Sequence, residues 1–381
     1  MDSTIMLEYQ WPCLLALLPA EARLEETASA MGALRRKRGV DSASSLLRLC
    51  LAYGFCGMTL RQTAAWAQVA QVANLSNVAL LKRLRAAGPW LGWLVGVKLA
   101  ERASPPPVTT HRLRLFDATT VSRPGSTGTD WRIHLGFDAA RLAIDDIELT
   151  DASGGESLTR FGLMPGQVAV ADRGYAHRRG LHSVRAQGAD FIVRINWQNL
   201  PLTDRASTPF DLFAFLRGLA ETVPAGQDVL VAACERDHLP ALPARLVAMR
   251  KSEPAAETTR RKILQEAAKK GRTVDPRTLE AAAYVMVLTS LLAETVPHVE
   301  ALDVYRFRWQ IELAFKRLKS LLCLDHLPAR DPPLARAFLY AKLLAALLLD
   351  DFTDRFLAFS PWGFRLAFPS AVSVAHPARA P

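Results

Sequence analysis

The sequence predicts an α/β protein in which a mixed sheet with helices follows an all-helical segment. Residues 1–103 are rich in Leu and Ala, and their apolar positions recur at intervals of three and four, which is typical of amphipathic helices. Pro105, Pro106 and Pro107 end this pattern, because consecutive prolines cannot continue a helix. Beyond them, three short apolar runs and then a strand-helix-strand pattern indicate the mixed sheet.

The composition narrows the range of possible functions. The chain has 381 residues, half of them apolar, which excludes a disordered protein and allows two or three domains. Lys and Arg outnumber Asp and Glu by 47 to 37, a formal charge of +10 that favours a polyanionic partner, either nucleic acid or an anionic membrane surface. Five scattered cysteines without a CxxC pair argue against a zinc ribbon and fit reduced thiols in a cytoplasm.

The sequence shows no sign of a membrane segment. Asp2 and Glu8 precede the first Leu-rich run, so the basic start of a signal peptide is missing. The longest late apolar run, residues 343–349, is about a third of a bilayer span. We therefore expect a cytoplasmic protein.

The first domain, residues 1–103, contains a pattern that resembles a helix-turn-helix. Two helices are expected between residues 59 and 89, the first opening at Thr59 and the second at Ser76, a good N-cap. The second helix would enter the major groove of DNA, and it carries Lys82, Arg83 and Arg85. The alternative is an ordinary helical bundle with a basic face. Twelve Lys/Arg against seven Asp/Glu in residues 1–103 fit both interpretations.

Residues 108–195 form the first part of the predicted sheet domain. Strands are expected at 113–116, 131–137, 144–149, 168–171 and 191–195, with a helix at 177–187. Asp117 follows the first strand and Asp172 the fourth. Open α/β sheets place their sites at the carboxyl ends of strands, and an unpaired carboxylate inside a strand core is unfavourable. Both are therefore candidate site residues, although each taken alone also fits a turn or helix-cap aspartate.

The rest of the chain falls into three further segments. Residues 196–283 have a looser pattern that suggests extra strands, and ten Lys/Arg against four Asp/Glu at 245–277 indicate a solvated face or a phosphate-tracking surface. Residues 284–330 begin with a buried strand at 284–288 that returns to the core. Residues 331–381 comprise an apolar helix at about 333–352 and an irregular tail.

A long helix is predicted from Pro297 to about Leu322. Its polar residues are spaced three, four and seven apart, which places them on one helical face: Tyr305, Arg308, Glu312 and Lys319. An apolar stripe lies beside them: Val304, Phe307, Ile311, Leu318 and Leu322. The alternative is a surface helix on which Arg308 and Glu312 form an ion pair.

These three blocks resemble the DDE transposases of the insertion-sequence-four family. The family signature Y-x2-R-x3-E-x6-K is matched by Tyr305, Arg308, Glu312 and Lys319, and its two acidic blocks by LFDATTV at Asp117 and VAVADRGY at Asp172. The resemblance covers residues 112–322. It implies an RNase H-like core with a β-rich insertion at 196–283, a DNA-binding N-terminal domain and a C-terminal helical segment. An insertion explains why 140 positions separate Asp172 from Glu312.

The resemblance also implies a catalytic chemistry. Asp117, Asp172 and Glu312 would be catalytic and hold two Mg²⁺ ions, for which Mn²⁺ would substitute, with Asp117 as the bridging ligand. Tyr305, Arg308 and Lys319 would contact DNA, together with Lys82, Arg83 and Arg85 of the first domain. Related enzymes stack a flipped base on an aromatic residue of the insertion, for which Tyr284 and Trp197 are candidates, although a strand aromatic is more often a core residue.

The predicted function is therefore a transposase that cleaves the ends of an insertion sequence and transfers the strands to target DNA, as a homo-oligomer on paired ends. Two other functions stay open, a domesticated relative that binds DNA without cutting it and an RNase H-like nuclease. His134 and His177 lie near the core strands and are expected to be structural residues.

Overall fold

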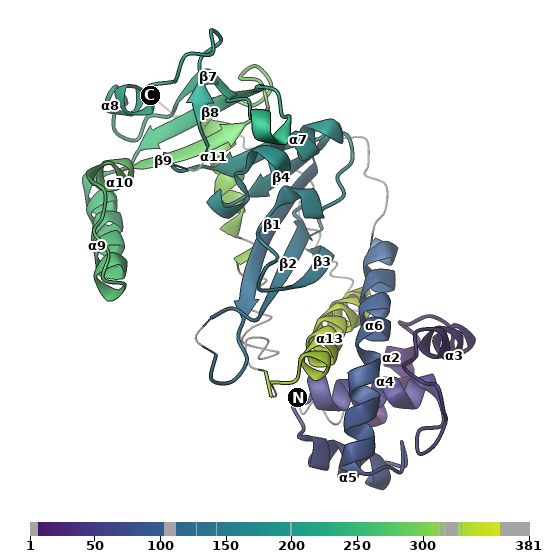
Figure 1. Cartoon of the computed structure of the whole chain (residues 1–381). Coiled ribbons are helices and arrows are strands. Elements are labelled where there is room, and N and C mark those ends of the chain that lie inside the picture. Colours follow the sequence, from purple (N-terminus) through teal and green to yellow (C-terminus); the bar gives the residue numbers. More distant parts are fainter. Residues whose placement is uncertain are drawn as a thin grey trace, which may run out of the picture. The chain divides into compact units, whose positions relative to one another are not determined.

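A computed structural model describes residues 7–102, 112–126, 128–141, 143–198, 200–309, 311–312, 316, 327–328 and 330–358, with side chains to residue 353 in the last range (Figure 1). The chain divides into two compact units. The first comprises Met1–Ala103, Val121–Gly128 and Arg317–Pro381, and the second comprises Ser104–Thr120 and Thr129–Lys316. The first unit thus groups the C-terminal segment with the N-terminal helices. The five segments expected from the sequence stay a prediction.

The described elements of the first unit, apart from the end of a strand of the second unit, are helices: α2 (Trp11–Leu15), α3 (Glu21–Ala30), α4 (Ala43–Gly54), α5 (Leu60–Val69), α6 (Asn77–Arg102) and α13 (Pro332–Ala358). Thr59 caps α5 in a reciprocal capping box with Gln62, and the Ser76 hydroxyl accepts a hydrogen bond from the Ala79 amide at the start of α6. Both helices of the predicted pair therefore begin where the sequence placed them.

The second helix of that pair is longer than we expected. It was predicted to end near Pro89, but α6 continues through this proline to Arg102. Trp90, Leu91 and Leu94 on the following turns are fully buried, and their burial outweighs the hydrogen bond that a proline removes from a helix.

The C-terminal helix α13 packs against α6 and α4 within the first unit. Gly54 of α4 permits close approach, because a Cβ atom there would lie 2.6 Å from Cβ of Ala341. By length and composition, Pro332–Thr353 qualifies as a membrane span, but 72% of its most apolar window is buried inside the structure. Its apolar surface is thus covered by neighbouring helices, as in the core helix of a globular unit.

The second unit is built on one nine-stranded sheet with the order β3-β2-β1-β4-β5-β9-β8-β7-β6 (Figure 1). Its first five strands are β1 (Arg112–Val121), β2 (Trp131–Asp138), β3 (Ala143–Asp151), β4 (Gln167–Ala171) and β5 (Asp190–Arg194). β2 and β3 pair antiparallel, whereas β4 pairs in parallel with β1 and with β5. The predicted mixed α/β fold is therefore confirmed.

The strand that carries Asp117 differs from our expectation. β1 does not stop before Asp117 but runs on to Val121, since Thr119, Thr120 and Val121 are β-branched and favour an extended chain. β4 ends at Ala171, so Asp172 follows it directly, as predicted. After it come η2 (Arg173–Tyr175) and α7 (Arg178–Ala186).

The remaining strands extend the same sheet beyond β5. They are β6 (Leu202–Thr203), β7 (Ala225–Val231), β8 (Leu242–Arg250) and β9 (Tyr284–Thr289), and β9 pairs antiparallel with both β5 and β8. This half also contains the helices α8 (Leu212–Arg217), α9 (Glu253–Lys269) and α10 (Pro276–Ala281), and the unit includes the short η1 (Leu158–Arg160) and η3 (Glu235–Asp237). α9 projects from the sheet (Figure 1).

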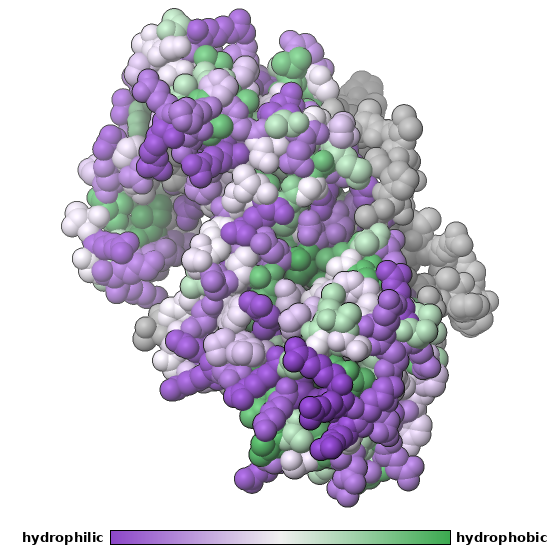
Figure 2. All heavy atoms as spheres, turned by 45° about the vertical axis from the view of Figure 1, so that its right-hand side comes forward, coloured by the Kyte–Doolittle hydropathy of each residue, from purple (hydrophilic) through white to green (hydrophobic). Residues whose placement is uncertain are grey.

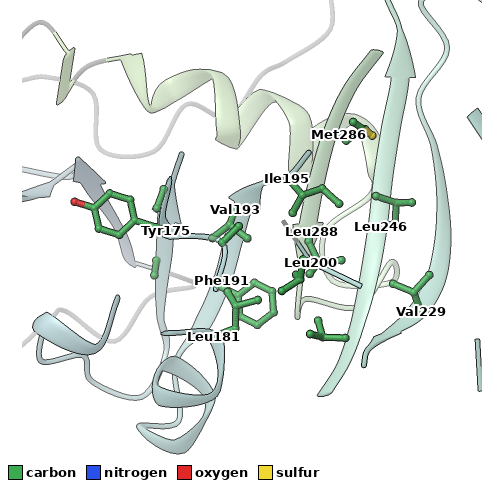
Figure 3. Packing of buried hydrophobic residues seen from close by; sticks show 14 of the residues in the cluster. Tyr175, Leu181, Phe191, Val193, Ile195, Leu200, Val229, Leu246, Met286 and Leu288 are labelled. Carbon is green, nitrogen blue, oxygen red and sulfur yellow. The ribbon is translucent and has the colours of Figure 1, made fainter. Parts of the chain in front are cut away.

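A continuous apolar core joins the two halves of the sheet. Phe191 and Val193 of β5, Leu288 of β9 and Leu246 of β8 belong to one buried cluster (Figure 3). Leu181 of α7 packs into it (Figure 3). Because the core is continuous, β5 and β9 form a rigid support for the elements that cross them.

The face of the molecule shown in Figure 2 is mainly polar. On the face that Figure 2 shows, hydrophilic residues predominate and apolar residues reach the surface in separate patches. Scattered apolar residues of this kind are normal on a folded protein.

The helix with the Tyr-Arg-Glu spacing packs on this sheet. α11 (His298–Phe307) begins after Pro297 as predicted, and it contacts β4, β5, β8 and β9. It ends at Phe307, whereas one helix was expected as far as Leu322. The amide of Arg308 bonds to the Tyr305 carbonyl three residues back, which tightens the last turn. Helical residues resume at Trp309, and Leu318, Lys319 and Leu322 lie outside the described residues.

Candidate active site

Asp117 and Asp172 are brought together by the register of two parallel strands. Phe116 of β1 pairs with Ala171 of β4, so the next residue on each strand is an aspartate. The pKa of Asp117 is raised to about 6, mainly by burial and also by the negative charges of Asp172 and Glu156, while the hydrogen bond from the Ala118 amide and the charge of Arg308 act in the opposite direction. Two carboxylates placed side by side in a partly buried site repel each other and attract a cation.

Tyr305 links α11 to the second aspartate. Its hydroxyl donates a hydrogen bond to Oδ1 of Asp172 over 3.2 Å. Burial raises the pKa of Tyr305, and so does the charge of Asp172, so the phenol stays protonated as a donor. The first residue of the spacing therefore orients a strand-end carboxylate.

Arg308 lies among the carboxylates. Its Nη1 is 3.6 Å from Oδ2 of Asp117, its Nη2 donates to Oε1 of Glu312 over 2.5 Å, and its guanidinium lies 5.6 Å from the Tyr305 ring centroid. Burial alone would lower the pKa of Arg308, but the negative charges around it raise the pKa instead. The guanidinium thus bridges Asp117 and Glu312 as a resident cation.

Four of the residues predicted for the catalytic core therefore lie together, namely Asp117, Asp172, Tyr305 and Arg308. Glu312 is joined to this group through its ion pair with Arg308. In the part of the chain that the structure describes, no group of three His, Cys, Asp or Glu side chains is close enough to hold a metal ion. The donor set nevertheless fits a divalent ion, because carboxylate oxygens are the ligands that Mg²⁺ prefers and a cation already lies between two of them. Lys319 lies outside the described residues.

A cavity of about 240 Å³ adjoins this group. It is lined by Arg194, Met249, Val285, Leu302, Tyr305, Arg306, Arg308, Trp309 and Glu312. Trp309 is 53% exposed, and sequence reasoning missed it, although it stands between Arg308 and Glu312 in the signature. Exposed aromatic rings beside guanidinium groups are a common platform for single-stranded nucleic acid.

The two aromatic candidates for base stacking are engaged elsewhere. Tyr284 is only 8% exposed and belongs to the core cluster, which favours the core interpretation. Trp197 donates to the Thr278 hydroxyl and packs edge-on against Phe213, and the Arg277 guanidinium lies 4.2 Å from its ring centroid.

The cations of α6 lie in the first unit and differ in their contacts. Arg83 donates to the carbonyls of Arg36 and Arg38, and Arg85 makes a bidentate ion pair with Asp331. Lys82 is exposed, with no polar partner among the described residues. Lys82 is therefore the cation of this trio that is free to meet a phosphate.

His134 is fully buried on β2 and shares a hydrogen bond of 3.0 Å with the Thr150 hydroxyl. Burial lowers the pKa of His134 to about 4, which keeps the ring neutral. This arrangement is typical of a structural histidine.

Known proteins match the chain over these same residues. The model of a family described as a transposase DDE domain matches residues 109–348, which span β1, the two aspartates and Glu312. The chain belongs to the DDE transposase family. The transposase of insertion sequence element IS421 from Escherichia coli is 43% identical over 355 residues, which cover 92% of this chain and 96% of that protein.

A second relative supports the same family. InsL, assigned as the transposase of insertion sequence element IS186A of Escherichia coli strain K12, is 43% identical over 354 residues, with the same coverage of both chains. Among solved structures, a piggyBac transposase synaptic complex with hairpin DNA covers 93% of this chain and 83% of that chain, at 9% identity and a TM-score of 0.44. The sequence relatives confirm the predicted family and enzyme class, a DDE transposase that depends on divalent metal ions to cleave and join DNA.

Proposed function

We propose that this transposase cleaves DNA at the ends of its own insertion sequence and transfers the strands to target DNA, with Asp117, Asp172 and Glu312 as the ligands of two Mg²⁺ ions. The observation that carries the proposal is the pairing of Phe116 with Ala171, which makes the two aspartates neighbours beside the helix residues Tyr305, Arg308 and Glu312. Mn²⁺ would substitute, since it also binds carboxylate oxygen.

The proposal includes an RNase H-like fold for the catalytic core. The strand order β3-β2-β1-β4-β5, with an antiparallel pair at one side and parallel neighbours around β4, supports an RNase H-like core. Residues 196–283 are the β-rich insertion within it. Residues 1–103 are the DNA-binding domain, supported by the capped pair α5 and α6 and by the exposed Lys82.

The chemistry follows from the charges of the site. Divalent ions, when bound, activate the attacking oxygen and stabilise the leaving oxygen of a phosphodiester. Asp117 would be a ligand of both ions, while Asp172, oriented by the Tyr305 hydroxyl, and Glu312 would each hold one of them. Arg308 neutralises Asp117 and Glu312 in the free protein and turns to a DNA phosphate in the complex, where its planar fork suits two phosphate oxygens.

DNA contact at the site involves the same helix. Lys319 contacts the backbone on the far side of Glu312, as the family signature implies. The cavity beside α11 receives the strand end, and the exposed ring of Trp309 suits base stacking better than the buried Tyr284. The protein acts as a homo-oligomer on paired ends, in the cytoplasm, where its DNA substrate is located.

An end-joining assay tests the proposal. The DNA that flanks the gene supplies the terminal inverted repeats, and a labelled fragment carrying one repeat is incubated with the protein, a target plasmid and Mg²⁺. We expect nicked, then joined products, all lost with a chelator. Binding without cleavage would indicate the domesticated relative, and cleavage of any DNA without joining would indicate an RNase H-like nuclease.

A further inference from the structure

A tight loop before η1 carries an acidic residue that the proposed mechanism does not use. This loop, residues 151–157, reads Asp-Ala-Ser-Gly-Gly-Glu-Ser. Two guanidinium groups hold its backbone: Arg132 donates to the Gly154 carbonyl over 2.9 Å and Arg160 to the Gly155 carbonyl over 2.8 Å. The position of Glu156, the next residue, is therefore fixed by the fold.

The Glu156 carboxylate lies against Gly174, two residues after Asp172. A Cβ atom at Gly174 would lie only 1.6 Å from Oε2 of Glu156, so no side chain fits there without displacing the carboxylate. The backbone of Gly174 does not have a positive φ, and the glycine is therefore explained by the space that it leaves. The glycine after the second catalytic aspartate thus makes room for a further acidic group.

Tyr175 supplies an independent observation at the same place. Its side chain is fully buried, and its hydroxyl has no hydrogen-bond partner among the described residues. Its ring is held through Phe161, which stacks on Phe116 at 4.2 Å between ring centroids. Burial raises the pKa of Tyr175, and the negative charges of Asp117 and Glu156 act in the same direction, so the hydroxyl stays protonated and can donate. A buried hydroxyl without a partner is unfavourable unless a bound group takes its hydrogen bond.

We propose that Glu156 is a further positioning residue of the metal site, a fourth carboxylate that acts with the Tyr175 hydroxyl on the hydration shell of the divalent ion held by Asp117. This inference rests on the proposed function. In this proposal Glu156 acts through a metal-bound water and is not itself a ligand. Mg²⁺ keeps several of its waters in proteins, and groups that bind such waters tune metal affinity.

Metal binding tests this proposal without relying on catalysis. Mn²⁺ is titrated into the full-length protein and free Mn²⁺ is measured by electron paramagnetic resonance. Glu156→Gln keeps the size of the side chain and removes its charge, and Gly174→Ala keeps the charge and displaces it. We expect each to weaken Mn²⁺ binding about 10-fold, the lower end for groups behind a metal ligand. Tyr175→Phe should weaken it by a smaller factor.

Two controls separate the possible failures. Glu266→Gln removes an exposed carboxylate from α9 and should leave Mn²⁺ affinity unchanged, while Asp117→Asn should lose most of the binding. Mn²⁺ affinity of wild-type strength in Glu156→Gln, with binding lost in Asp117→Asn, would overturn the role of Glu156 and leave the proposed function standing. Unchanged affinity in Asp117→Asn would overturn the proposed metal site itself. Thermal unfolding without metal shows whether each variant is folded, and Glu156→Asp should restore part of the affinity.

Discussion

The carboxylates on the sheet and the carboxylate on the helix are held in different ways. Asp117 and Asp172 are positioned by the pairing of β1 with β4, and the Asp117 side chain is only 21% exposed. Glu312 follows the end of α11 at Phe307, its side chain is 55% exposed, and its described contact is the ion pair with Arg308. In the proposed metal site, the sheet would thus fix two ligands before any ion binds, whereas the third would be adjustable and held by a cation that an incoming ion can replace.

The largest expected effect is the loss of any one of the three acids. Asp117→Asn, Asp172→Asn and Glu312→Gln should each lower end cleavage by on the order of 10³-fold or more. A neutral amide cannot replace a carboxylate as a ligand, and the bound ion stabilises the charge of the transition state by several kcal/mol. The variants should differ in metal binding: Asp117→Asn should lose more Mn²⁺ affinity than Glu312→Gln.

Cleavage of a labelled end and Mn²⁺ titration measure the two properties, with end binding as the control for folding. Near wild-type cleavage by one variant would remove that residue from the triad. Equal loss of Mn²⁺ affinity in Asp117→Asn and Glu312→Gln would mean that the helix residue is held as firmly as the strand residue.

Arg308 is the second test, since it connects the two kinds of carboxylate. Arg308→Ala should still bind Mn²⁺, because a competing cation is removed, but strand joining should fall by about 10²-fold, because the DNA end is no longer held in register. First-strand nicking should fall less. Arg308→Lys keeps the charge without the planar fork and should lie between the two.

The products of one labelled end report nicking, hairpin formation and joining together. Lys319→Ala, which removes the last cation of the family signature, serves as the parallel variant. Equal loss of all three products in both variants would mean that these cations serve the metal site or the fold and do not position DNA.

A smaller effect is expected for the cations of α6 in the proposed DNA-binding domain. Lys82→Ala should lower the slope of log affinity against log salt by about 0.9, the value for one lost phosphate contact. Arg85→Ala should change the slope less, because its guanidinium is already paired with Asp331. Asp331→Asn frees this guanidinium and should steepen the slope, and an unchanged slope in Lys82→Ala would argue against phosphate contact by α6.

The smallest expected effect concerns the stability of the sheet beside the site. The pKa of His134 is about 4 in the folded protein, below its ordinary value near 6.5, so only the unfolded chain binds a proton between these values. The contribution of the neutral ring to the free energy of unfolding is therefore complete above pH 6.5, and it falls by about 1 kcal/mol per pH unit down to pH 4. Urea unfolding at pH 7 and 5 measures this loss, which His134→Gln should reduce. The same pH dependence in that variant would exclude His134 as its source.

The sequence predicted the parts of the site that depend on local pattern. The positions of Asp117 and Asp172 beside strands were predicted because apolar runs identify strands, and Tyr305 and Arg308 were placed on one helical face by their spacing, while their assignment to the site came from the family resemblance. The helix break at Arg308 was missed, since a spacing argument assumes one continuous helix and the tightened last turn has no local signal. The length of α6 was missed because burial of Trp90 overrides Pro89.

Glu156 was missed for a different reason. It reaches Gly174 only through the fold of a distant loop, and its sequence neighbours, two glycines and a serine, are typical of an ordinary turn. Likewise, nothing in the local pattern distinguishes the buried ring of Tyr284 from the exposed ring of Trp309. Long-range packing decides both, and a single sequence does not report it.

Iron-mediated cleavage of the polypeptide tests most directly whether all three carboxylates meet at one metal site. Fe²⁺ replaces Mg²⁺ in the complex with end DNA, ascorbate and peroxide generate hydroxyl radicals at the ion, and mass spectrometry maps the broken peptide bonds. We predict cuts near Asp117, Asp172 and Glu312, with the cut near Glu312 lost in Glu312→Gln. Cuts confined to the neighbourhood of the two aspartates, even with DNA bound, would contradict the assignment of Glu312 as the third ligand.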